Sequence, residues 1–533
     1  MEEIVIAQPD RISIPLFLHQ LKSIEEMERL ERTHEIELTS SIYITTKIGV
    51  LGDLPGYGKS LSTLGLISRT VDDPLDDTTA VEQKTVFQFV SQIKVEMLQQ
   101  VKCTLILVNV SLISQWIQEL NRTLLRFTSI YKNSEIEDID LNAYDVILVG
   151  NNIYNLFSQV YRKKSWKRFI IDEPASLKLP AMESSHAQFY WLITGTPNEL
   201  YQKRRTGFLN DLLPPDDMAD IFQHLIIKND DQFVKSSYVM PTTRHLYYKC
   251  AGNLSEFFEG IVPDSMLEML QAGNISGVFN MLENGTQETT TLFDAYKSRK
   301  MKRLTELQKE KEMDEKIIEK IEAIHNCINL LDEKVFKYIL HQPCMICNKP
   351  HTMEPFVLSC CHHIFCGKCV TDICPICKTV GVQKMQLALK QANSGEEAVH
   401  YSHFSQSYSN TRCPYKMSIL MDIIGDVTNK KILIFSNYNE SFVVVKKFLE
   451  ERNLLYLELR GTKEKRDNTI DAYKTGVVNI LLLNTIHSGA GLNLQETSDI
   501  ILFHKIHEYQ RVQVIGRANR IGRKIQLTVH CLE

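Results

Sequence analysis

The sequence has no apolar run long enough to cross a membrane, and it lacks the start of a secreted protein. Its apolar stretches, such as Ile432–Phe435, fall far short of the roughly 20 residues that a membrane span needs. The first residues, MEEIVIAQPD, are acidic and do not show the basic-then-apolar order of a signal peptide. These absences exclude secreted and membrane-embedded classes, and we expect an intracellular protein.

An excess of charge of one sign is also absent. The chain carries 60 Lys and Arg against 65 Asp and Glu, a formal net charge of −5, which argues against a protein that coats DNA with basic side chains. A near-neutral body can still carry a basic groove. With 533 residues, 44% of them apolar, the chain is too hydrophobic for a disordered tail and long enough for about two to four domains.

Cysteine is scarce outside one block. Eight of the 13 cysteines lie between Cys344 and Cys377, and the other five are scattered along the chain. A disulfide framework spreads its pairs over a small secreted domain, whereas one dense block in a long intracellular chain indicates metal.

Two parts of the chain alternate short β-branched runs with helical or polar segments. Examples are Thr104–Asn109 and Asp145–Val149 in the first part, and the runs that begin at Lys431 and Val477 in the second. This alternation predicts parallel sheets covered on both faces, so the fold class is α/β. We expect an N-terminal lobe, a helical insertion, a zinc finger, a polar linker and a C-terminal lobe, at 1–250, 251–340, 341–382, 383–411 and 412–533.

The insertion contains a charged helical run from Lys297 to Leu340. Apolar residues along it step by four, three, four and three, which is the spacing of a seam between helices, at Ile317, Ile321, Ile324, Ile328 and Leu331. The pattern predicts a coiled coil or a helical hairpin. A solvated helix that lies against the body is the simpler alternative.

A glycine-rich turn, LGDLPGYGKS, follows an apolar segment and leads into a helical pattern. Gly56 and Gly58 let successive backbone N–H groups face a polyphosphate. Lys59 adds a positive charge at the β- and γ-phosphates, and the Ser60 hydroxyl can bind Mg²⁺. The strict GxxxxGK(S/T) spelling fails because Asp53 occupies the first glycine position, so alone the segment also fits an ordinary glycine turn.

A pair of carboxylates favours the phosphate interpretation. In FIIDEPA, Asp172 and Glu173 follow a short apolar run and therefore lie at the end of a strand. Asp172 can hold Mg²⁺ through its water shell, and Glu173 can orient and deprotonate an attacking water. The pair precedes the segment LITGTP, and this ordered series argues against a merely solvated surface pair.

Two arginines near the C-terminus lie in QVIGRANRIGR. We expect Arg517 and Arg520 to lie one helical turn apart on the same face. Guanidinium groups placed in this way can reach a γ-phosphate across a cleft and neutralise its developing charge. A basic helix with solvated arginines is the alternative, which the two earlier segments disfavour.

Together these segments resemble the motifs of superfamily 2 helicase-type ATPases of the Swi/Snf branch. In chain order, the similar segments are PLFLHQLKSIEEM, GDLPGYGKS, TLILVNVSLISQWIQEL, WKRFIIDEPASLK, LITGTPNEL, KILIFSNYNESFVVVKKFL, NTIHSGAGLNLQETSDIILFH and QVIGRANRIGR. The eight motifs follow the family's order and cover most of both lobes.

The resemblance implies two RecA-like parallel-sheet lobes around an ATP cleft. It implies that Gln20 reads adenine and that further nucleotide contacts come from Gly56, Gly58, Lys59, Ser60, Gly491 and Gln513. It also implies that Mg²⁺ and hydrolysis depend on Ser60, Asp172, Glu173, Arg517 and Arg520, together with Lys59. The helix expected after NTIHSGAGLNLQETSDIILFH, in KIHEYQRVQ, is short, a form associated with versions of the family from large DNA viruses. A viral source is therefore one hypothesis, and the expected site of action is the nucleus, or a host cell or virion if the source is viral.

Some positions depart from the family's pattern. Ala175 stands where the usual DEAH or DEGH has histidine, so it cannot relay between ATP and the LITGTP segment. TGTPNEL lacks the usual Gln-Asn after proline, and Ser488 and Ala490 break a glycine run. The residues for hydrolysis remain in place, so these departures bear on the coupling of hydrolysis to movement.

The cysteine block, CMICNKPHTMEPFVLSCCHHIFCGKCVTDICPICK, contains pairs spaced by two residues, which form tight knuckles around tetrahedral Zn²⁺. Seven cysteines and one histidine suffice for two structural zinc sites, and metal binding supplies the folding free energy of such modules. The spacing resembles a RING finger, which implies one site of Cys344, Cys347, Cys366 and Cys369 and another of Cys361, His363, Cys374 and Cys377. Cys360 and His362 are neighbouring alternatives.

RING fingers usually recruit a ubiquitin-conjugating enzyme through a shallow apolar groove, and a basic residue after the last zinc ligand contacts ubiquitin. The resemblance places Ile346 and Pro375 in the groove and Lys378 at the basic position. A RING that only docks another protein is the alternative.

Helicase-type lobes grip the phosphate backbone, so their contacts are expected to be salt-sensitive and to carry little sequence information. Two basic runs are candidates, although either can be a solvated face: Arg162, Lys163, Lys164, Lys167 and Arg168, and Lys297, Arg299, Lys300, Lys302 and Arg303. Double-stranded DNA is the expected partner because the Swi/Snf branch tracks duplexes without opening them, while RNA is open from the sequence alone.

The leading hypothesis is an ATP-driven translocase on double-stranded DNA, with an inserted RING that acts as a ubiquitin ligase, similar to the postreplication-repair and helicase-like transcription factor group. A second hypothesis is an adaptor that clamps DNA while its RING docks a partner. A third is an RNA helicase or transcription-release factor.

Overall fold

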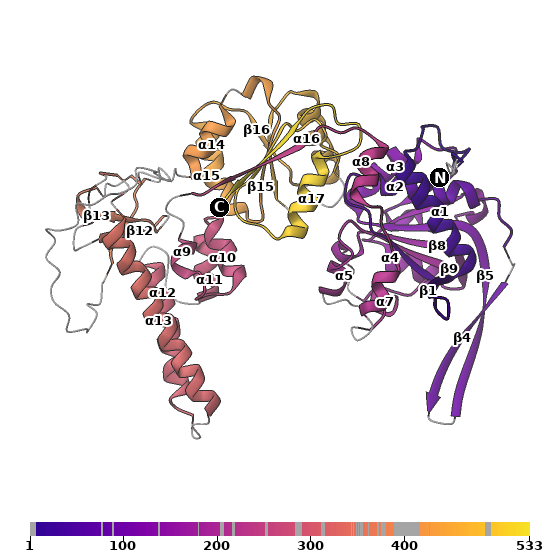
Figure 1. Cartoon of the computed structure of the whole chain (residues 1–533), viewed down its shortest axis with the longest axis horizontal. Coiled ribbons are helices and arrows are strands. Elements are labelled where there is room, and N and C mark those ends of the chain that lie inside the picture. Colours follow the sequence, from indigo (N-terminus) through magenta and orange to yellow (C-terminus); the bar gives the residue numbers. More distant parts are fainter. Residues whose placement is uncertain are drawn as a thin grey trace.

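The computed structural model contains two α/β lobes, a helical insertion and a small zinc-finger-like module (Figure 1). It describes residues 7–75, 78–87, 90–136, 139–177, 179, 181–202, 207–215, 219–250, 254–282, 290–310, 315–342, 344, 346–347, 349, 351, 355–360, 362–369, 373–374, 380–387, 416–425, 427–484 and 492–533. None of the helices in these ranges is long and apolar enough to cross a membrane.

The first lobe is built on a sheet whose strands are parallel except for β4, which pairs antiparallel with β5. In spatial order the parallel strands are β10 (Ile226–Ile227), β3 (Ile48–Leu51), β9 (His186–Ile193), β8 (Lys164–Asp172), β5 (Val90–Val108), β7 (Val146–Gly150) and β6 (Phe127–Ile130). The hairpin of β4 (Thr78–Phe87) and the start of β5 projects from the lobe (Figure 1). A separate small hairpin pairs β1 (Glu35–Thr39) with β2 (Ile42–Thr45).

Both faces of this sheet are covered. Along β5, Leu105 and Leu107 pack into one apolar core and Ile106 and Val108 into another, which explains why its sequence is continuously apolar. The helices of the lobe are α1 (Leu18–Thr33), α2 (Lys59–Thr70), α3 (Ile113–Leu120), α4 (Tyr154–Val160), α5 (Glu199–Gln202), α6 (Phe208–Asp211), α7 (Ala219–His224) and α8 (Asp231–Ser237).

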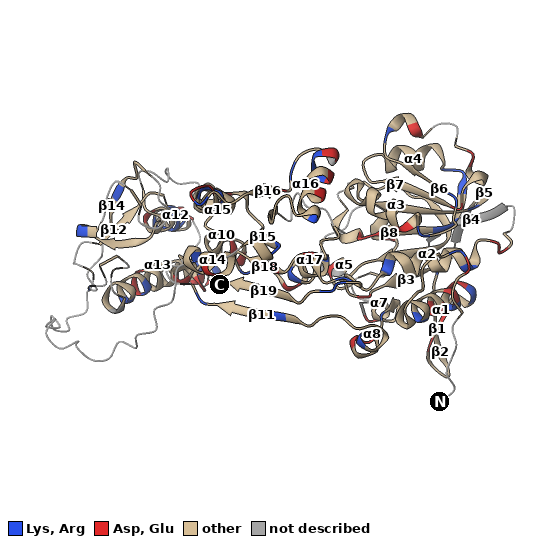
Figure 2. Ribbon diagram, turned by 90° about the horizontal axis from the view of Figure 1, so that it is seen from above, with Lys and Arg blue, Asp and Glu red and all other residues tan. Residues whose placement is uncertain are grey.

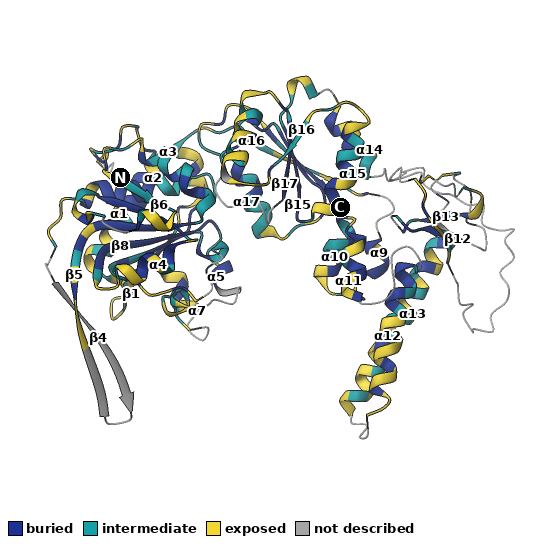
Figure 3. Cartoon of the chain, turned by 180° about the vertical axis from the view of Figure 1, so that it is seen from behind, coloured by how far each residue is buried: buried dark blue, intermediate teal, exposed yellow. Residues whose placement is uncertain are grey.

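The second lobe repeats this design with a parallel sheet in the order β11, β19, β18, β15, β17 and β16. The bounds are β11 (Thr243–Tyr248), β19 (Leu527–Leu532), β18 (Asp499–Leu502), β15 (Ile432–Ser436), β17 (Ile480–Asn484) and β16 (Tyr456–Glu458). Its helices are α14 (Lys416–Ile424), α15 (Asn439–Glu450), α16 (Lys463–Thr475) and α17 (Glu508–Ala518). The central strands of both sheets, such as β7, β15 and β17, are buried (Figure 3), so the predicted α/β class with two parallel-sheet lobes is confirmed.

The boundary of the first lobe differs from the prediction. The sequence places everything up to residue 250 in that lobe, but β11 pairs in parallel with β19 and is therefore an edge strand of the second sheet. The Tyr248 hydroxyl and His530 Nδ1 share a hydrogen bond at 3.0 Å. Cys250 packs into the apolar core of the second lobe. The chain thus enters the second lobe before it enters the insertion.

The insertion consists of three short helices and a long hairpin, α9 (Ser255–Phe258), α10 (Asp264–Gln271), α11 (Ile275–Leu282), α12 (Leu292–Leu307) and α13 (Glu315–His341). Of the two predicted forms, the structure has the helical hairpin. Ile324 packs with Leu304 and Leu307 of α12, flanked by Ile317 and Ile328. The far end of the hairpin is largely exposed (Figure 3).

The insertion is attached to the second lobe. The half-buried Lys416 donates from its ammonium to Gln271 O and to Phe503 O, both at 2.8 Å. The Ser441 hydroxyl donates to Ala272 O at 2.6 Å. These bonds join the end of α10 to α14, α15 and the segment after β18, so the insertion is held against the second lobe.

The zinc-finger-like module has a small antiparallel sheet in the order β13 (Ile364–Cys366), β12 (Pro355–Leu358) and β14 (Lys384–Gln386). Leu387 N donates to Pro355 O at 2.9 Å. The sequence assigns residues from 383 onward to a linker, and this boundary is wrong, because 384–387 form part of the module.

Candidate functional site

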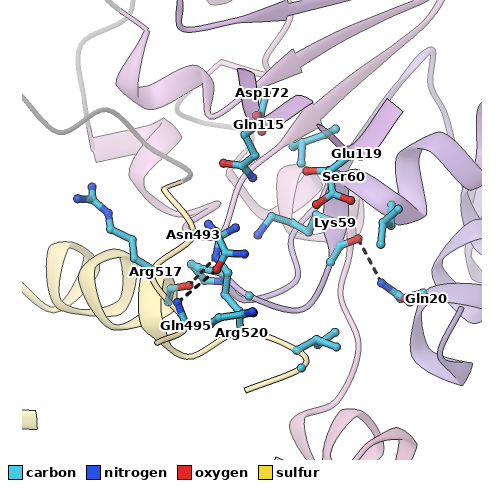
Figure 4. A pocket seen from close by; sticks show the side chains of 18 of the residues that line it. Gln20, Lys59, Ser60, Gln115, Glu119, Asp172, Asn493, Gln495, Arg517 and Arg520 are labelled. Atoms are coloured by element: carbon cyan, nitrogen blue, oxygen red, sulfur yellow. Dashed lines mark hydrogen bonds between the residues drawn. The ribbon is translucent and has the colours of Figure 1, made fainter. Parts of the chain in front are cut away.

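A cavity of about 410 Å³ lies between the two lobes. It is lined by residues that the sequence singles out on both sides: Gln20, Gly56, Gly58, Lys59, Ser60, Asp172, Glu173, Gln513, Arg517 and Arg520. Figure 4 shows Lys59, Ser60 and Asp172 coming from the first lobe, and Arg517 and Arg520 coming from the second. Gly491 lies outside the described residues.

The lobes touch beside this cavity. A Cβ built on Gly56 would lie 2.2 Å from the carbonyl oxygen of Asn519, and one on Gly516 would lie 2.3 Å from Cβ of Pro55. Gly56 has φ +94°, which a residue with a Cβ rarely adopts. Glycine is therefore required at Gly56 both by its backbone angle and by the neighbouring lobe.

The glycine-rich loop leads from β3 into α2. Gly58, with φ +80°, precedes Lys59, the first residue of this 12-residue helix, so the helix N-terminus faces the cavity. The Lys59 ammonium donates to Asp53 O at 2.8 Å. Burial lowers the pKa of Lys59, and the carboxylates of Glu173, Asp53 and Asp172 oppose this effect.

Asp53, which replaces the first glycine of the strict motif, is a buried anchor. Its carboxylate accepts hydrogen bonds from Asn229 N at 2.8 Å, from Asn229 Nδ2 at 2.9 Å and from Ser23 Oγ at 3.3 Å. These bonds hold the loop against α1 and against the segment between β10 and α8. The departure from the strict motif therefore fixes the loop's position.

The two carboxylates lie at the end of β8, as predicted. Asp172 is the last residue of the strand, and the indole Nε1 of Trp116 donates to its Oδ2 at 2.8 Å. Glu173 has φ +47°, and its backbone N donates to Ile193 O at 2.8 Å. Since a left-handed residue other than glycine is strained, the bond to Ile193 helps to hold the Glu173 side chain at the cavity.

Glu173 also contacts the LITGTP segment directly. Thr194 Oγ1 donates to Glu173 Oε2 at 3.0 Å, and Gly195 N donates to Oε1 at 3.4 Å. Ala175 has no polar side chain to connect the carboxylate pair with the LITGTP segment, and Glu173 makes this connection through its own hydrogen bonds. Burial raises the pKa of both Asp172 and Glu173, and for Asp172 the neighbouring Glu173 carboxylate adds to this.

The arginines differ from the prediction in one respect. Helix α17 ends at Ala518, so Arg520 lies in the turn after the helix rather than on the same helical face as Arg517. Both nevertheless line the cavity. Burial lowers the pKa of Arg520 to about 10, while Glu119 and Asp172 across the cleft raise it.

Arg517 is only 4% exposed, and its Nη1 has no hydrogen-bond partner among the described residues. Burial lowers its pKa to about 10, with Arg520 and Arg466 adding to this effect. An unpaired buried guanidinium nitrogen is costly, and an anion in the cavity would satisfy it.

The cavity has lining residues that the sequence did not indicate. Ile14, Pro15, Phe17 and Ile521 form an apolar part beside Gln20, which suits a flat aromatic base. Gln20 Oε1 accepts from Phe17 N at 2.9 Å, and Gln20 Nε2 donates to Gly58 O at 3.4 Å. Polar groups without a predicted role come from both lobes, namely Gln115, Glu119, Asn493 and Gln495 (Figure 4).

Two protein-family models match this chain. Residues 19–225 match the model of the SNF2-related domain, and residues 415–522 match that of the helicase conserved C-terminal domain. The chain belongs to the Swi/Snf-type superfamily 2 helicase-like ATPases. As a Swi/Snf-type ATPase it hydrolyses ATP, and the two matched regions are the two lobes that face each other across the cavity.

Three similar proteins match different shares of this chain. A protein of Acanthamoeba polyphaga mimivirus that is named as a helicase, R592, is 24% identical, over 92% of this Swi/Snf-type chain and 68% of its own length. The human E3 ubiquitin-protein ligase SHPRH is 27% identical over 36% of this chain and 12% of its own length. The Sulfolobus solfataricus SWI2/SNF2 ATPase core in complex with dsDNA has 15% identity and a TM-score of 0.35, and the match covers 99% of this chain and 90% of that one.

The cysteine block brings together four of its predicted ligands. The Sγ atoms of Cys344, Cys347, Cys366 and Cys369 all lie within 4.8 Å of one another. The Sγ atoms of Cys347 and Cys366 are 3.7 Å apart. Four thiolates at about 2.3 Å from one Zn²⁺ have S–S edges of about 3.8 Å, so the cluster fits a tetrahedral zinc site.

The second set of ligands is described only in part. Cys361 and Cys377 lie outside the described residues, while Cys374 is buried and His363 half-buried. Of the alternatives, His362 is turned toward the insertion, because its Nδ1 accepts from Leu292 N at 3.3 Å and its ring lies 5.3 Å from that of Phe279. Cys360 packs beside the small core that contains Cys374.

Only part of the first basic run is exposed and could contact nucleic acid. Arg168 is 2% exposed and pairs with Glu31 at 2.5 Å, and Lys167 is buried and donates to Thr70 O. These two predicted contacts are wrong, because both side chains support the first lobe internally, whereas Arg162 and Lys163 are exposed.

In the second run, Lys297 pairs with Asp332 of α13, while Arg299, Lys302 and Arg303 are exposed. Lys300 lies 5.4 Å from the ring centre of Tyr296. Figure 2 shows Lys and Arg interspersed with Asp and Glu over both lobes.

Proposed function

We propose that this Swi/Snf-type ATPase is a double-stranded DNA translocase with a RING module that acts as a ubiquitin ligase. The observation that carries the motor part is the single cavity to which the first lobe contributes Lys59, Asp172 and Glu173 and the second contributes Arg517 and Arg520. A nucleotide bound there links the lobes, so its hydrolysis can change their relative position.

In this proposal ATP enters with its base between Phe17 and Ile521, next to Gln20, and its phosphates at the start of α2. Lys59 leaves the Asp53 carbonyl for the β- and γ-phosphates. Ser60 and Asp172 offer the oxygen ligands that Mg²⁺ prefers, and the ion neutralises phosphate charge when bound.

Glu173 acts as the base in the proposed reaction. It accepts a proton from the attacking water, and its raised pKa brings its proton affinity closer to the working pH. The water attacks the γ-phosphorus, the bond to the bridging oxygen breaks, and ADP and phosphate form. Arg520 and Arg517 stabilise the negative charge that develops on the transferred group.

Double-stranded DNA is proposed as the track because the chain belongs to the Swi/Snf branch, whose lobes follow a duplex without opening it. We expect duplex DNA to raise kcat for ATP hydrolysis by at least about 10-fold, and high salt to reduce this effect because phosphate contacts release counterions. A steady-state assay with duplex DNA, single-stranded DNA and RNA checks this, with Glu173→Gln as the inactive reference.

The rival functions predict other outcomes of the same assay. A rate that duplex DNA leaves unchanged contradicts the translocase and favours the DNA-clamping adaptor. Stimulation by RNA and not by duplex DNA favours the RNA helicase or transcription-release factor.

The zinc part of the proposal rests on the four-cysteine cluster and on the similarity to SHPRH, which is named as an E3 ubiquitin-protein ligase. Two Zn²⁺ ions would hold the module, and Ile346, 45% exposed beside the cluster, would contact the ubiquitin-conjugating enzyme. Pro375, the other groove position, and Lys378, the basic residue after the last zinc ligand, lie outside the described residues.

We expect Ile346→Ala to lower autoubiquitination at least about 10-fold while zinc content and ATP hydrolysis stay unchanged, because the side chain is exposed and does not line the ATP cavity. Zinc content is measured by elemental analysis. Val380→Ala is a matched control, since Val380 is also an exposed apolar residue of the module, at 71%. Ligase activity that survives Ile346→Ala contradicts the groove, and no activity with any conjugating enzyme favours a docking role.

A further inference from the structure

Helix α3 reaches the ATP cavity from behind the carboxylate pair. Its Trp116 is 1% exposed, and the indole Nε1 donates to Asp172 Oδ2 at 2.8 Å. A buried tryptophan usually finds a partner for its N–H, but here that partner is a charged group at the cavity rather than a backbone carbonyl. The bond therefore links the apolar core of the first lobe to the site.

The surroundings hold the indole in place. Trp116 belongs to the apolar core that includes Leu64 of α2 and Ile170 of β8. The start of the helix is fixed as well, because Asn109 Oδ1 accepts from Ser111 N at 3.1 Å and Val110 N donates to Asn151 Oδ1 at 3.0 Å. The donor is thus fixed by groups that do not touch the cavity.

A carboxylate that binds Mg²⁺ must present its oxygens in one orientation, since Mg²⁺ demands near-octahedral geometry. A hydrogen bond at Oδ2 restricts rotation of the Asp172 carboxylate about its Cβ–Cγ bond. A carboxylate that is already held in one orientation loses less rotational freedom when the metal binds, so this hydrogen bond favours metal binding.

We propose that Trp116 is a positioning residue for Mg²⁺, which acts by holding the carboxylate of Asp172 in its metal-binding orientation. The inference rests on the proposed role of Asp172 and goes beyond it, because it assigns part of the metal affinity to a residue that does not touch the metal. Loss of such an outer partner typically costs about 10- to 100-fold in metal affinity.

The test is the affinity for Mn²⁺, a paramagnetic substitute for Mg²⁺, in the full-length protein saturated with a non-hydrolysable ATP analogue. Trp116→Phe keeps an aromatic ring and removes the donor, and we expect it to weaken Mn²⁺ binding about 10- to 100-fold while the affinity for the analogue without metal is unchanged. Trp166→Phe is the matched control, since Trp166 is also 1% exposed in the first lobe's core and packs on Phe157 away from the cavity.

Unchanged Mn²⁺ affinity in Trp116→Phe overturns the proposal, and so does an equal loss in Trp166→Phe. Asp172→Asn separates this failure from that of the proposed site, because it should weaken Mn²⁺ binding whether or not Trp116 contributes. If Trp116→Phe does not fold, the wild-type protein with ¹⁵N in its three indoles gives a second readout. Spectra of Trp166→Phe and Trp191→Phe then assign the Trp116 signal, which should shift on Mg²⁺ addition, and a signal that does not shift contradicts the proposal.

Discussion

Glu173→Gln is expected to lower kcat for ATP hydrolysis by about 10²- to 10⁴-fold, the usual contribution of a general base. Glutamine has the same shape and can still accept the hydrogen bond from Thr194, but it cannot take a proton from water. Binding of ATP should remain within a few-fold of the parent, because the phosphates are held by the glycine-rich loop. Steady-state hydrolysis and equilibrium binding of a fluorescent ATP analogue measure the two effects.

Glu183→Gln is the control for this prediction. Glu183 is an exposed residue of the same lobe whose Oε1 accepts from Gln159, and its loss of charge should leave hydrolysis unchanged. If Glu173→Gln retains more than about a tenth of the parent rate, the assignment of the base is wrong.

Arg520→Ala is expected to reduce kcat by about 10³-fold, at the lower end of what a transition-state arginine contributes. Arg520 reaches the cavity from the second lobe and lies in the field of Asp172 and Glu119 of the first. Removing it leaves the first lobe's half of the site intact, so ATP should still bind. Single-turnover hydrolysis separates the slowed chemical step from ATP binding.

Lys524→Ala controls for loss of a positive charge near the same end of α17, because Lys524 is exposed and does not line the cavity. It should hydrolyse ATP at the parent rate. An Arg520→Ala protein that hydrolyses ATP normally would mean that Arg520 takes no part in the reaction.

Much of the fold follows from local patterns. Parallel strands buried on both faces have continuous apolar sequences, which is why β5, β7, β15 and β17 could be found without a structure. The helical hairpin is equally visible, since the three-and-four spacing of its isoleucines directly reflects the contact between α12 and α13.

Long-range pairing could not be predicted in the same way. Nothing in the local sequence of β11 states that it joins β19, the last strand of the chain, so the lobe boundary was misplaced. Arg168 is a second example of a long-range pairing. Its place in a basic run predicts a solvated side chain, but the fold brings Glu31 beside it and the two form an ion pair. Such pairings depend on tertiary structure and leave no periodic signal.

In the site too, local motifs could be predicted from the sequence and long-range contacts could not. The glycine-rich loop, the carboxylate pair and the second-lobe arginines have fixed spacing, and the sequence indicated them before their meeting in one cavity was known. The bond between Trp116 and Asp172 joins two segments that are far apart in the chain, and a tryptophan in an apolar helix face indicates only a core residue. The sequence shows Asp53 only as a departure from the strict glycine-rich motif. Its hydrogen bonds to Asn229 and Ser23, which explain the residue, depend on the fold.

The central claim is that one nucleotide is held by both lobes at once. The most direct test is a crystal structure of the full-length protein with ADP, Mg²⁺ and aluminium fluoride, which imitates the transferred phosphoryl group. We expect Lys59 and Arg520 to contact the fluoride from opposite sides, with Glu173 beside the attacking water. A nucleotide contacted by the first lobe alone, with Arg517 and Arg520 turned to solvent, would contradict the claim.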